Sequence, residues 1–365
     1  MERKFMKLAI SLAEKGTGKV NPNPLVGAVI VKNGEITGTG YHQKYGGLHA
    51  ERNALKNCTD AEGATMYVTL TPCCHTGKTP PCTEALIESG IKKAVIGSRD
   101  PNPLVGEKSI KILRNAGIEV VEDFMKKECD ALNPVFFKYI STRRPYVVMK
   151  FAETLDGKIA TSTMESRWIT GEKAREHVHN SRSKYTGIMV GVNTVLKDNP
   201  LLNCRAEGGR NPVRIVCDTS LRTPLTSRLV ATADTYPLII ATAVTDENRI
   251  KPYLERHCTI LKLNKGSDSH IDLNQLMTEL GKREIDSILL EGGSALHGSA
   301  LAAGIVDKVE AYIAPKIFGG KEAPSPVGGN GVLHPSDAII LENVRITQLG
   351  EDILIEGDVK KCSQE

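Results

Sequence analysis

The sequence is poor in aromatic residues and in net charge. Aromatic side chains make up 4% of the 365 residues, Trp168 is the single tryptophan, and 47 basic residues against 43 acidic ones give a formal charge of +4. A protein that stacks single-stranded nucleic acid needs more aromatic platforms. A dedicated nucleic-acid binder also carries a basic face. The composition therefore argues against a nucleic-acid partner.

Long hydrophobic runs are also missing. No stretch approaches the roughly 18 apolar residues of a membrane-spanning helix, and the charged start, Met1 to Lys7, is not followed by the apolar core of a secretion signal. The nine cysteines are odd in number and are not spaced as a disulfide framework. We therefore expect a protein of the reducing cytoplasm that has no membrane contact.

Three side chains in the first third of the chain have the spacing of a zinc site. His49 opens the segment His-Ala-Glu, Cys73 lies in Thr-Pro-Cys-Cys-His, and Cys82 ends Thr-Pro-Pro-Cys. One imidazole and two thiolates fill three corners of a zinc tetrahedron and leave the fourth open for water, whose pKa zinc lowers toward neutrality. Glu51 is close enough to handle the protons of that water. This pattern is the signature of zinc-dependent nucleobase deaminases.

The spacing of the cysteines departs from that signature, and a structural zinc site is the alternative. Deaminases usually have two residues between these cysteines, whereas eight separate Cys73 from Cys82. The insert contains Gly-Lys-Thr (77–79), which suits a small phosphate-binding loop. A structural zinc site has four ligands, and Cys74 or His75 would have to supply the fourth.

The first part of the chain alternates helical and strand patterns. Asn33-Gly34 is a strong hairpin signal, and the glycine at position 90 ends a helix. Alternation of this kind implies a mixed sheet flanked by helices, with the zinc residues at helix N-termini beyond strand ends. The expected helices are 3–15, one opened by His49, one opened by Pro81-Cys82, and 109–115; the expected strands are 28–31, 36–41, 66–70, 94–97 and 118–121.

Residues 123–142 are predicted to form one charged connecting helix, which Arg143-Arg-Pro145 breaks. A chain of this length is expected to have two or three domains, and we place two, at 1–144, with 123–144 as the connecting helix, and at 145–365. The second domain is again α/β. Its expected strands are 147–151, 188–192, 214–217, 238–241, 288–290 and 309–313, with a helix over 171–184 and further helices between the strands.

A glycine-rich turn, Glu291 to Ser299, follows a predicted strand and opens a helix. Backbone N–H groups at such a turn can hold the phosphate of a dinucleotide or of a sugar phosphate. The turn does not have the G-x-G-x-x-G pattern, and a simple tight connection between strand and helix explains it equally well.

Taken together, these motifs resemble the bifunctional riboflavin-biosynthesis deaminase–reductase family over essentially the whole chain. The resemblance implies an α/β fold class with an N-terminal cytidine-deaminase-like domain, a mixed sheet with flanking helices, and a C-terminal dihydrofolate-reductase-like α/β domain. The segments that carry it are 21–27, 49–51, 76–82 and 100–103, and then 155–160, 166–170, 194–200 and 291–298.

The resemblance implies two consecutive reactions with zinc and NADPH as cofactors. The first is hydrolysis of a cyclic amidine, in which 2,5-diamino-6-ribosylamino-4(3H)-pyrimidinone 5′-phosphate loses an amine as ammonia. The second reduces the ribosyl group of 5-amino-6-(5-phosphoribosylamino)uracil to ribityl. The expected partner is this small phosphorylated pyrimidine, and the family suggests a homo-oligomer.

The resemblance also implies roles for individual residues. His49, Cys73 and Cys82 would bind zinc, and Glu51 would transfer protons. Lys150 and Asp156 are nearby polar candidates without a firm role. The residues implied for the substrate are Asn23, His42, His75, Lys78, Thr79, Asn102, Ser166, Arg182, Leu202, Arg205 and Glu291. The residues implied for NADPH are Ala152, Trp168, Thr194, Asp198, Thr219, Gly293, Ser294, Ala295, Leu296, His297, Gly298 and Ser299.

The sequence departs from the family pattern at two places, and on the sequence alone two other functions remain open. Thr71 stands where the family commonly has glutamate, and residues 106–109, Gly-Glu-Lys-Ser, have fewer glycines than the family loop. One other function is a deaminase of a different substrate, such as a nucleoside or tRNA adenine, with an unrelated second domain. The other is a non-catalytic binding protein that zinc stabilises, and Glu51 discriminates against it because a binding protein needs no proton carrier.

Overall fold

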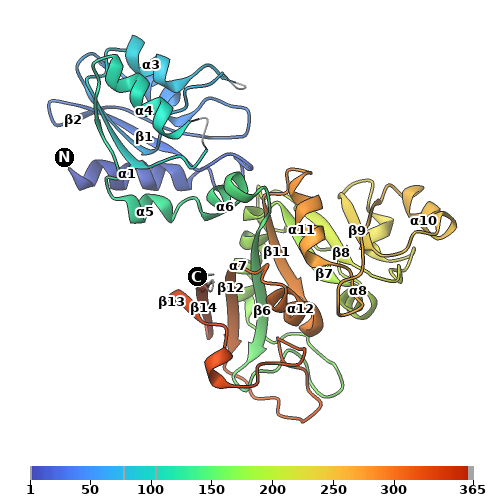
Figure 1. The fold of residues 1–365 in the computed structure, drawn as a ribbon. Helices are drawn as coiled ribbons and strands as arrows, with labels where there is room; N and C mark the ends of the chain where they lie inside the picture. The colour runs from blue at the N-terminus through green and yellow to red at the C-terminus, as the bar shows by residue number, and fades with distance from the viewer. Residues whose placement is uncertain (1, 77–78, 103–104, 361–365) are drawn as a thin grey trace. The chain divides into compact units, whose positions relative to one another are not determined.

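The chain separates into two compact units, residues 1–143 and 144–365 (Figure 1). The structure, a computed structural model, describes residues 2–76, 79–102 and 105–360. None of the helices in these ranges is both long enough and apolar enough to cross a membrane. Each unit has its own sheet and its own hydrophobic clusters, so each is described by itself.

The first unit is built on a mixed sheet, as predicted, with five strands among its described residues in the order β2-β1-β3-β4-β5. β1 pairs antiparallel with β2 and β3, and β3, β4 and β5 are parallel. The predicted hairpin is confirmed, because Asn33 and Gly34 both have the positive φ that such a turn requires. The strands are β1 Gly27–Lys32, β2 Glu35–Tyr41, β3 Thr65–Leu70, β4 Lys93–Ser98 and β5 Glu119–Val121.

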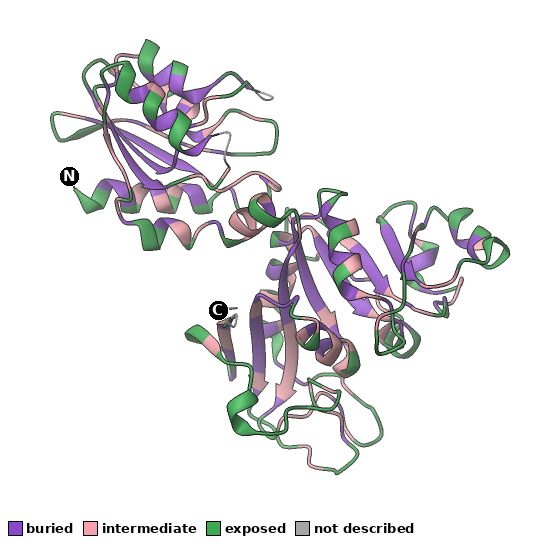
Figure 2. Cartoon of the chain, in the orientation of Figure 1, coloured by how far each residue is buried: buried purple, intermediate pink, exposed green. Residues whose placement is uncertain are grey.

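Helices cover both faces of this sheet (Figure 1). Successive side chains of a strand point to opposite faces, so in β1 Ala28 and Ile30 pack under α2, α3 and α4, whereas Val29 and Val31 pack against α1 and α5. Figure 2 shows the strands as buried and the outer helix faces as exposed. The helices are α1 Arg3–Glu14, α2 Ala50–Lys56, α3 Cys82–Glu88, α4 Gly106–Asn115, α5 Lys126–Asp130 and α6 Pro134–Thr142.

The prediction of one helix across residues 123–142 is wrong. The segment forms α5 and α6 with a break between them. Pro134 has no N–H for a helix interior and takes the first turn of α6 instead. Asn133 lies just before it, and its side chain accepts from the Leu25 N–H at 2.8 Å and donates to the Leu25 carbonyl at 2.9 Å. This anchor holds α6 beside the loop that precedes β1.

The second unit is built on a nine-stranded sheet in its described residues, in the order β10-β9-β8-β7-β11-β6-β12-β14-β13. Neighbours from β10 to β12 are parallel, and β14 and β13 complete the sheet as antiparallel strands. The strands are β6 Tyr146–Thr154, β7 Gly187–Gly191, β8 Val213–Cys217, β9 Leu238–Thr242, β10 Thr259–Lys262, β11 Ser287–Gly292, β12 Lys308–Ala314, β13 Leu341–Leu349 and β14 Asp352–Val359.

Helices also cover this sheet on both faces. α11 and α12 pack on one face, where Leu276 and Ala300 join Leu290 in one cluster. α9 and α10 pack on the other face, and α7 covers β12 and β14 through Ala174 and Tyr312. The helices are α7 Glu172–Lys184, α8 Val192–Asp198, α9 Arg228–Ala231, α10 Glu247–Leu254, α11 Leu273–Gly281 and α12 Ser294–Ala302, with a short 3₁₀ turn, η1, at Pro335–Asp337.

Candidate functional site

The three predicted zinc residues come together in the first unit. Nδ1 of His49 lies 3.4 Å from Sγ of Cys73 and 3.5 Å from Sγ of Cys82. Their ligand atoms form a compact group, all within 4.8 Å of one another. No other such cluster of His, Cys, Asp and Glu occurs among the described residues. The geometry thus favours three protein ligands over the closed set of a structural zinc site.

These ligands lie at the ends of three secondary-structure elements. His49 is the N-cap of α2, Cys82 is the first residue of α3, and Cys73 follows the end of β3. Two backbone contacts tie the start of α3 to Cys73: the Cys82 N–H donates to Sγ of Cys73 at 3.4 Å, and the Thr83 N–H donates to its carbonyl at 3.1 Å. The predicted placement at helix N-termini beyond a strand end is confirmed.

The separations fit a zinc ion. Zn–S bonds of about 2.3 Å and Zn–N bonds of about 2.0 Å put tetrahedral sulfur and nitrogen ligands about 3.5 Å apart. The other ring nitrogen of His49, Nε2, lies 3.5 Å from Oγ1 of Thr79. A ligating histidine commonly donates from its second nitrogen in this way, which fixes its tautomer. The donor set and its surroundings therefore match zinc.

Protonation of the two thiols differs. A hydrogen bond from the Cys82 side chain has the largest effect on the pKa of Cys73. Together with hydrogen bonds from His49 and from the Cys82 N–H, it lowers the pKa of Cys73 to about 4, although burial acts in the opposite direction. The same contact and burial raise the pKa of Cys82 well above its usual range. Cys73 therefore ionises to a thiolate more readily than Cys82.

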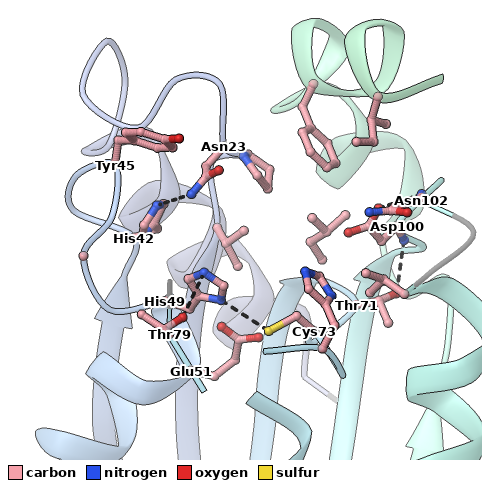
Figure 3. Close-up of a pocket in the computed structure, with 18 of the residues that line it drawn as sticks. Asn23, His42, Tyr45, His49, Glu51, Thr71, Cys73, Thr79, Asp100 and Asn102 are labelled. Carbon is pink, nitrogen blue, oxygen red and sulfur yellow. Dashed lines mark hydrogen bonds between the residues drawn. The ribbon is translucent and has the colours of Figure 1, made fainter. Parts of the chain in front are cut away.

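Glu51 lies beside this cluster (Figure 3). Only 3% of its surface is exposed, and it lines the same cavity as His49 and Cys73. Burial, followed by the nearby charge of Cys73, raises the pKa of its carboxyl. A carboxyl with this burial and position can exchange protons with a molecule in the cavity.

The cavity above the cluster has a volume of about 290 Å³. Nδ1 of His42 lies 3.0 Å from the Leu48 carbonyl, so Nε2 is free to accept from the Asn23 amide at 3.2 Å (Figure 3). Lys78 lies outside the described residues. The predicted substrate residues that line this cavity are Asn23, His42, His75, Thr79 and Asn102.

Other residues of this cavity were not predicted from the sequence. Asp100 accepts from the Asn102 N–H at 2.8 Å, and burial raises the pKa of its carboxyl to about 6. Asp100 begins one of the segments that resemble the family, but nothing in the residue pattern marks its side chain as part of a cavity. The wall also contains Tyr45, Phe136 and Ile140. The last two come from α6, so the predicted connecting segment contributes to the cavity of the first unit.

A second cavity, of about 780 Å³, lies in the second unit. One wall is the glycine-rich turn, where β11 ends at Gly292, Gly293 has a φ of 97°, and α12 begins at Ser294. The predicted strand-to-helix turn is confirmed. The predicted residues that line this cavity are Ser166, Thr194, Asp198, Thr219, Gly293, Ser294, Ala295, Leu296 and Ser299. Asn193, Arg222, Lys265, Asp268 and His270 also line it and were not predicted.

Four predicted cofactor residues are not among the described residues that line the cavity. His297 is buried, and its Nδ1 lies 2.8 Å from the Pro326 carbonyl. A Cβ on Gly298 would lie 2.2 Å from the Gly328 carbonyl oxygen, so only glycine fits there. Ala152 belongs to β6. Trp168 is 63% exposed, with the Arg175 guanidinium 4.6 Å from its ring centre.

Two of the remaining predicted substrate residues, Arg182 and Glu291, form an ion pair. Arg182 donates to both carboxylate oxygens of Glu291 and, at 3.1 Å, to the Asn203 carbonyl. Leu202 is 5% exposed and has a φ of 55°, so its side chain belongs to the core and its backbone bends sharply. Arg205 is exposed.

Charges around Glu291 set its ionisation. Burial alone would raise the pKa of this carboxyl, but the charge and hydrogen bonds of Arg182, with the charge of Lys150, outweigh burial and lower the pKa to about 2. Burial lowers the pKa of Lys150, against the charge of Glu291. The site thus holds an ionised carboxylate between cationic groups.

Comparison with known proteins assigns both units. The RibD C-terminal domain matches residues 145–355, and the cytidine and deoxycytidylate deaminase zinc-binding region matches residues 1–98. The riboflavin biosynthesis protein RibD of Actinobacillus pleuropneumoniae is 55% identical over 353 residues, which cover 96% of this chain and 94% of that protein. The chain belongs to the RibD family.

Solved RibD structures agree over nearly the full chain. RibD of Acinetobacter baumannii has a TM-score of 0.88 at 34% identity, covering 98% of this chain and 99% of its own. The deaminase/reductase of Thermotoga maritima has a TM-score of 0.84 at 40% identity, covering 98% of each chain. The predicted fold class is confirmed. The protein is a zinc-dependent deaminase and an NADPH-dependent reductase of riboflavin biosynthesis.

The two departures from the RibD pattern have local structural roles. Thr71 accepts from the Asp100 N–H at 3.2 Å and donates to the Ser98 carbonyl at 3.3 Å, so it links the ends of β3 and β4. Gly106 to Ser109 form the first turn of α4, which begins three residues earlier than the predicted start at 109. Both departures therefore sit in ordered hydrogen-bonded structure beside the first cavity.

Proposed function

We propose that residues 1–144 deaminate 2,5-diamino-6-ribosylamino-4(3H)-pyrimidinone 5′-phosphate and that residues 145–365 reduce the ribosyl group of 5-amino-6-(5-phosphoribosylamino)uracil to ribityl. The observation that carries the proposal is the convergence of His49, Cys73 and Cys82 beside a buried Glu51 in a cavity. The Thermotoga maritima relative supports it, since that protein is named for both activities, as a diaminohydroxyphosphoribosylaminopyrimidine deaminase and a 5-amino-6-(5-phosphoribosylamino)uracil reductase.

In the first reaction, water replaces an exocyclic amine of the pyrimidine. His49, Cys73 and Cys82 would hold zinc, which when bound acidifies a water at its open position. An oxygen of the Glu51 carboxylate accepts one proton of the attacking water and passes it to a ring nitrogen. It then accepts the second proton of that water and delivers it to the amine, which leaves as ammonia while the ring carbon becomes a carbonyl. One carboxylate can serve as base and then as acid because burial keeps its pKa above that of an exposed glutamate.

The cavity walls orient the pyrimidine over Glu51. Asn23 and His42 are already hydrogen-bonded to each other, so their polar atoms are positioned before the substrate arrives. Asn102 is held by its turn with Asp100. His75 and Thr79, with Lys78, would bind the ribosyl phosphate. Fixed polar groups of this kind reduce the entropic cost of orienting the substrate.

In the second reaction, NADPH supplies the hydride. Thr194, Asp198, Thr219 and the glycine-rich turn line the large cavity and would hold the cofactor. Ala152 and Trp168 are not among the described residues that line it, and the family resemblance alone supports their role in binding NADPH. His297 and Gly298 would act indirectly, because both support the turn from behind. Ser166, Arg182, Leu202, Arg205 and Glu291 would position the sugar phosphate.

The proposal extends to partners and setting. The substrate is a small phosphorylated pyrimidine, and the small net charge of +4 supports such a substrate over a nucleic acid. We place the enzyme in the cytoplasm, because the nine cysteines suit a reducing compartment, and we expect a homo-oligomer.

A coupled assay tests both halves. Zinc-loaded protein receives the diaminopyrimidine ribosyl phosphate, and ammonia and NADPH are followed together. We expect ammonia release followed by an equal loss of NADPH. A second sample, stripped of zinc with a chelator, receives the deaminated substrate and should still consume NADPH. Ammonia without NADPH loss would refute the proposed reductase substrate, and absence of both signals in folded, zinc-loaded protein would refute the whole assignment.

A further inference from the structure

Arg52 joins two segments of the first unit that carry zinc residues. It lies in the first turn of α2, directly after Glu51, and its side chain is half-buried. Nε donates to the Pro80 carbonyl at 3.1 Å, and Nη2 donates to the Pro81 carbonyl at 2.7 Å. A single guanidinium therefore binds two successive carbonyls immediately before Cys82.

The position of these carbonyls matters for the spacing of the ligands. His49 caps α2, which carries Arg52, whereas Cys82 opens α3 at the end of the eight-residue insert after Cys73. The backbone contacts of Cys82 and Thr83 already tie the start of α3 to Cys73. Arg52 adds the missing connection, because it ties the same start of α3 to the helix that His49 caps.

The chemistry of the insert explains why an arginine is used. Prolines have no backbone N–H, so Pro80 and Pro81 offer only carbonyl oxygens for anchoring. Two adjacent acceptors need two donors in a fixed relation. The planar guanidinium supplies its donors in a rigid fork, whereas a lysine ammonium is a single compact charge on a flexible stem.

We propose that Arg52 is a positioning residue of the zinc site, whose guanidinium clamps Pro80 and Pro81 and so sets the distance between His49 and Cys82. The inference rests on the proposed zinc ligands and goes beyond them. Arg52 touches neither the metal nor the substrate in this assignment. Its effect is on how firmly the protein retains zinc, because loss of the clamp frees the backbone that carries Cys82.

The test measures zinc release from the full-length holoenzyme with a chromophoric chelator. Arg52→Ala removes both donors, and Arg52→Lys keeps the charge without the fork. Lys56→Ala, which removes an exposed cation from the same helix, is the matched control. We expect Arg52→Ala to release zinc roughly tenfold faster than the wild type, the scale typical of residues that support metal ligands. Arg52→Lys should be intermediate and Lys56→Ala unchanged.

Further readouts separate the clamp from other effects. The thermal midpoint of the zinc-free protein should change little in Arg52→Ala, while the stabilisation on adding zinc should shrink. NADPH consumption with the deaminated substrate should stay at the wild-type rate. If Arg52→Ala released zinc at the wild-type rate, the clamp would be overturned. If Arg52→Lys released zinc at the wild-type rate, the clamp would also be overturned, in favour of an effect of the positive charge on His49. A wild type that binds no zinc would overturn the proposed site itself, and the clamp with it.

Discussion

Both carboxylate oxygens of Glu291 accept hydrogen bonds from Arg182, Oε1 from Nε and Oε2 from Nη2, each at 2.7 Å. The side chains are only 9% and 15% exposed. A bidentate pair of this kind combines charge with fixed geometry. It joins α7 to the end of β11, so the pair that we assign to the substrate site also connects a helix to the central sheet of the second unit.

Removal of one partner should destabilise the second unit. Arg182→Ala leaves a buried carboxylate without its ion pair, which typically costs about 3–5 kcal/mol. Urea denaturation would measure the change in the free energy of unfolding. Lys262→Ala, which breaks an exposed pair with Glu247, should cost less than about 1 kcal/mol. Equal losses in the two variants would contradict the argument.

The same pair predicts an acid dependence of stability. The pKa of Glu291 in the folded protein, about 2, lies below its ordinary value of 4.5. Its contribution to stability is therefore complete above about pH 4.5 and is lost as the pH falls toward 2. The free energy of unfolding of the wild type should exceed that of Glu291→Gln by a constant amount at pH 5–7, and the difference should shrink below pH 4.5. A difference that stays constant to pH 3 would contradict the assignment.

Glu51→Gln should abolish deamination without loss of zinc. The substitution keeps the shape of the side chain but removes its capacity to carry a proton, and general acid–base groups typically contribute about 10²–10⁴-fold to the rate. Ammonia release measures activity, and metal analysis measures zinc. Glu88→Gln, which alters an exposed carboxylate on α3, should behave as the wild type. Full activity of zinc-loaded Glu51→Gln would refute the mechanism.

Lys316 should influence NADPH binding through Trp168. Its Nζ donates to the Trp168 carbonyl at 2.9 Å and to the Ile169 carbonyl at 2.6 Å, which holds the segment that carries the exposed indole. Loss of both hydrogen bonds in Lys316→Met should raise the KM for NADPH by up to roughly 30-fold, since each contributes about 1 kcal/mol, with a smaller effect on kcat. Lys321→Met is the exposed control. An unchanged KM would exclude this role of the lysine.

Local patterns predicted most of the metal site and the hairpin. His49, Glu51, Cys73 and Cys82 could be recognised because zinc imposes residue types and spacings that survive in the sequence. The turn at Asn33 and Gly34 was equally visible, since few residue pairs accept its backbone conformation.

Features that depend on tertiary contacts could not be predicted. The break between α5 and α6 depends partly on the hydrogen bonds of Asn133 to Leu25, which is 108 residues away. β13 is exposed along most of its length, and the alternation of apolar and polar residues in its sequence is confined to the short run 344–347, which is too little to mark a nine-residue strand. Asp100 lines a cavity with residues that only the folded chain brings near, and Arg52 binds the carbonyls of Pro80 and Pro81, which lie 28 and 29 residues away in the sequence.

The close approach of Gly298 to Gly328 divides the glycine-rich turn into variable and invariable positions for protein engineering. A library aimed at a different cofactor can vary Ser294, Ala295 and Leu296, whose side chains border the cavity. Position 298 allows no such choice, because any side chain would occupy the space of a backbone carbonyl. Selection from a fully randomised turn should therefore return many residues at 294–296 and glycine alone at 298.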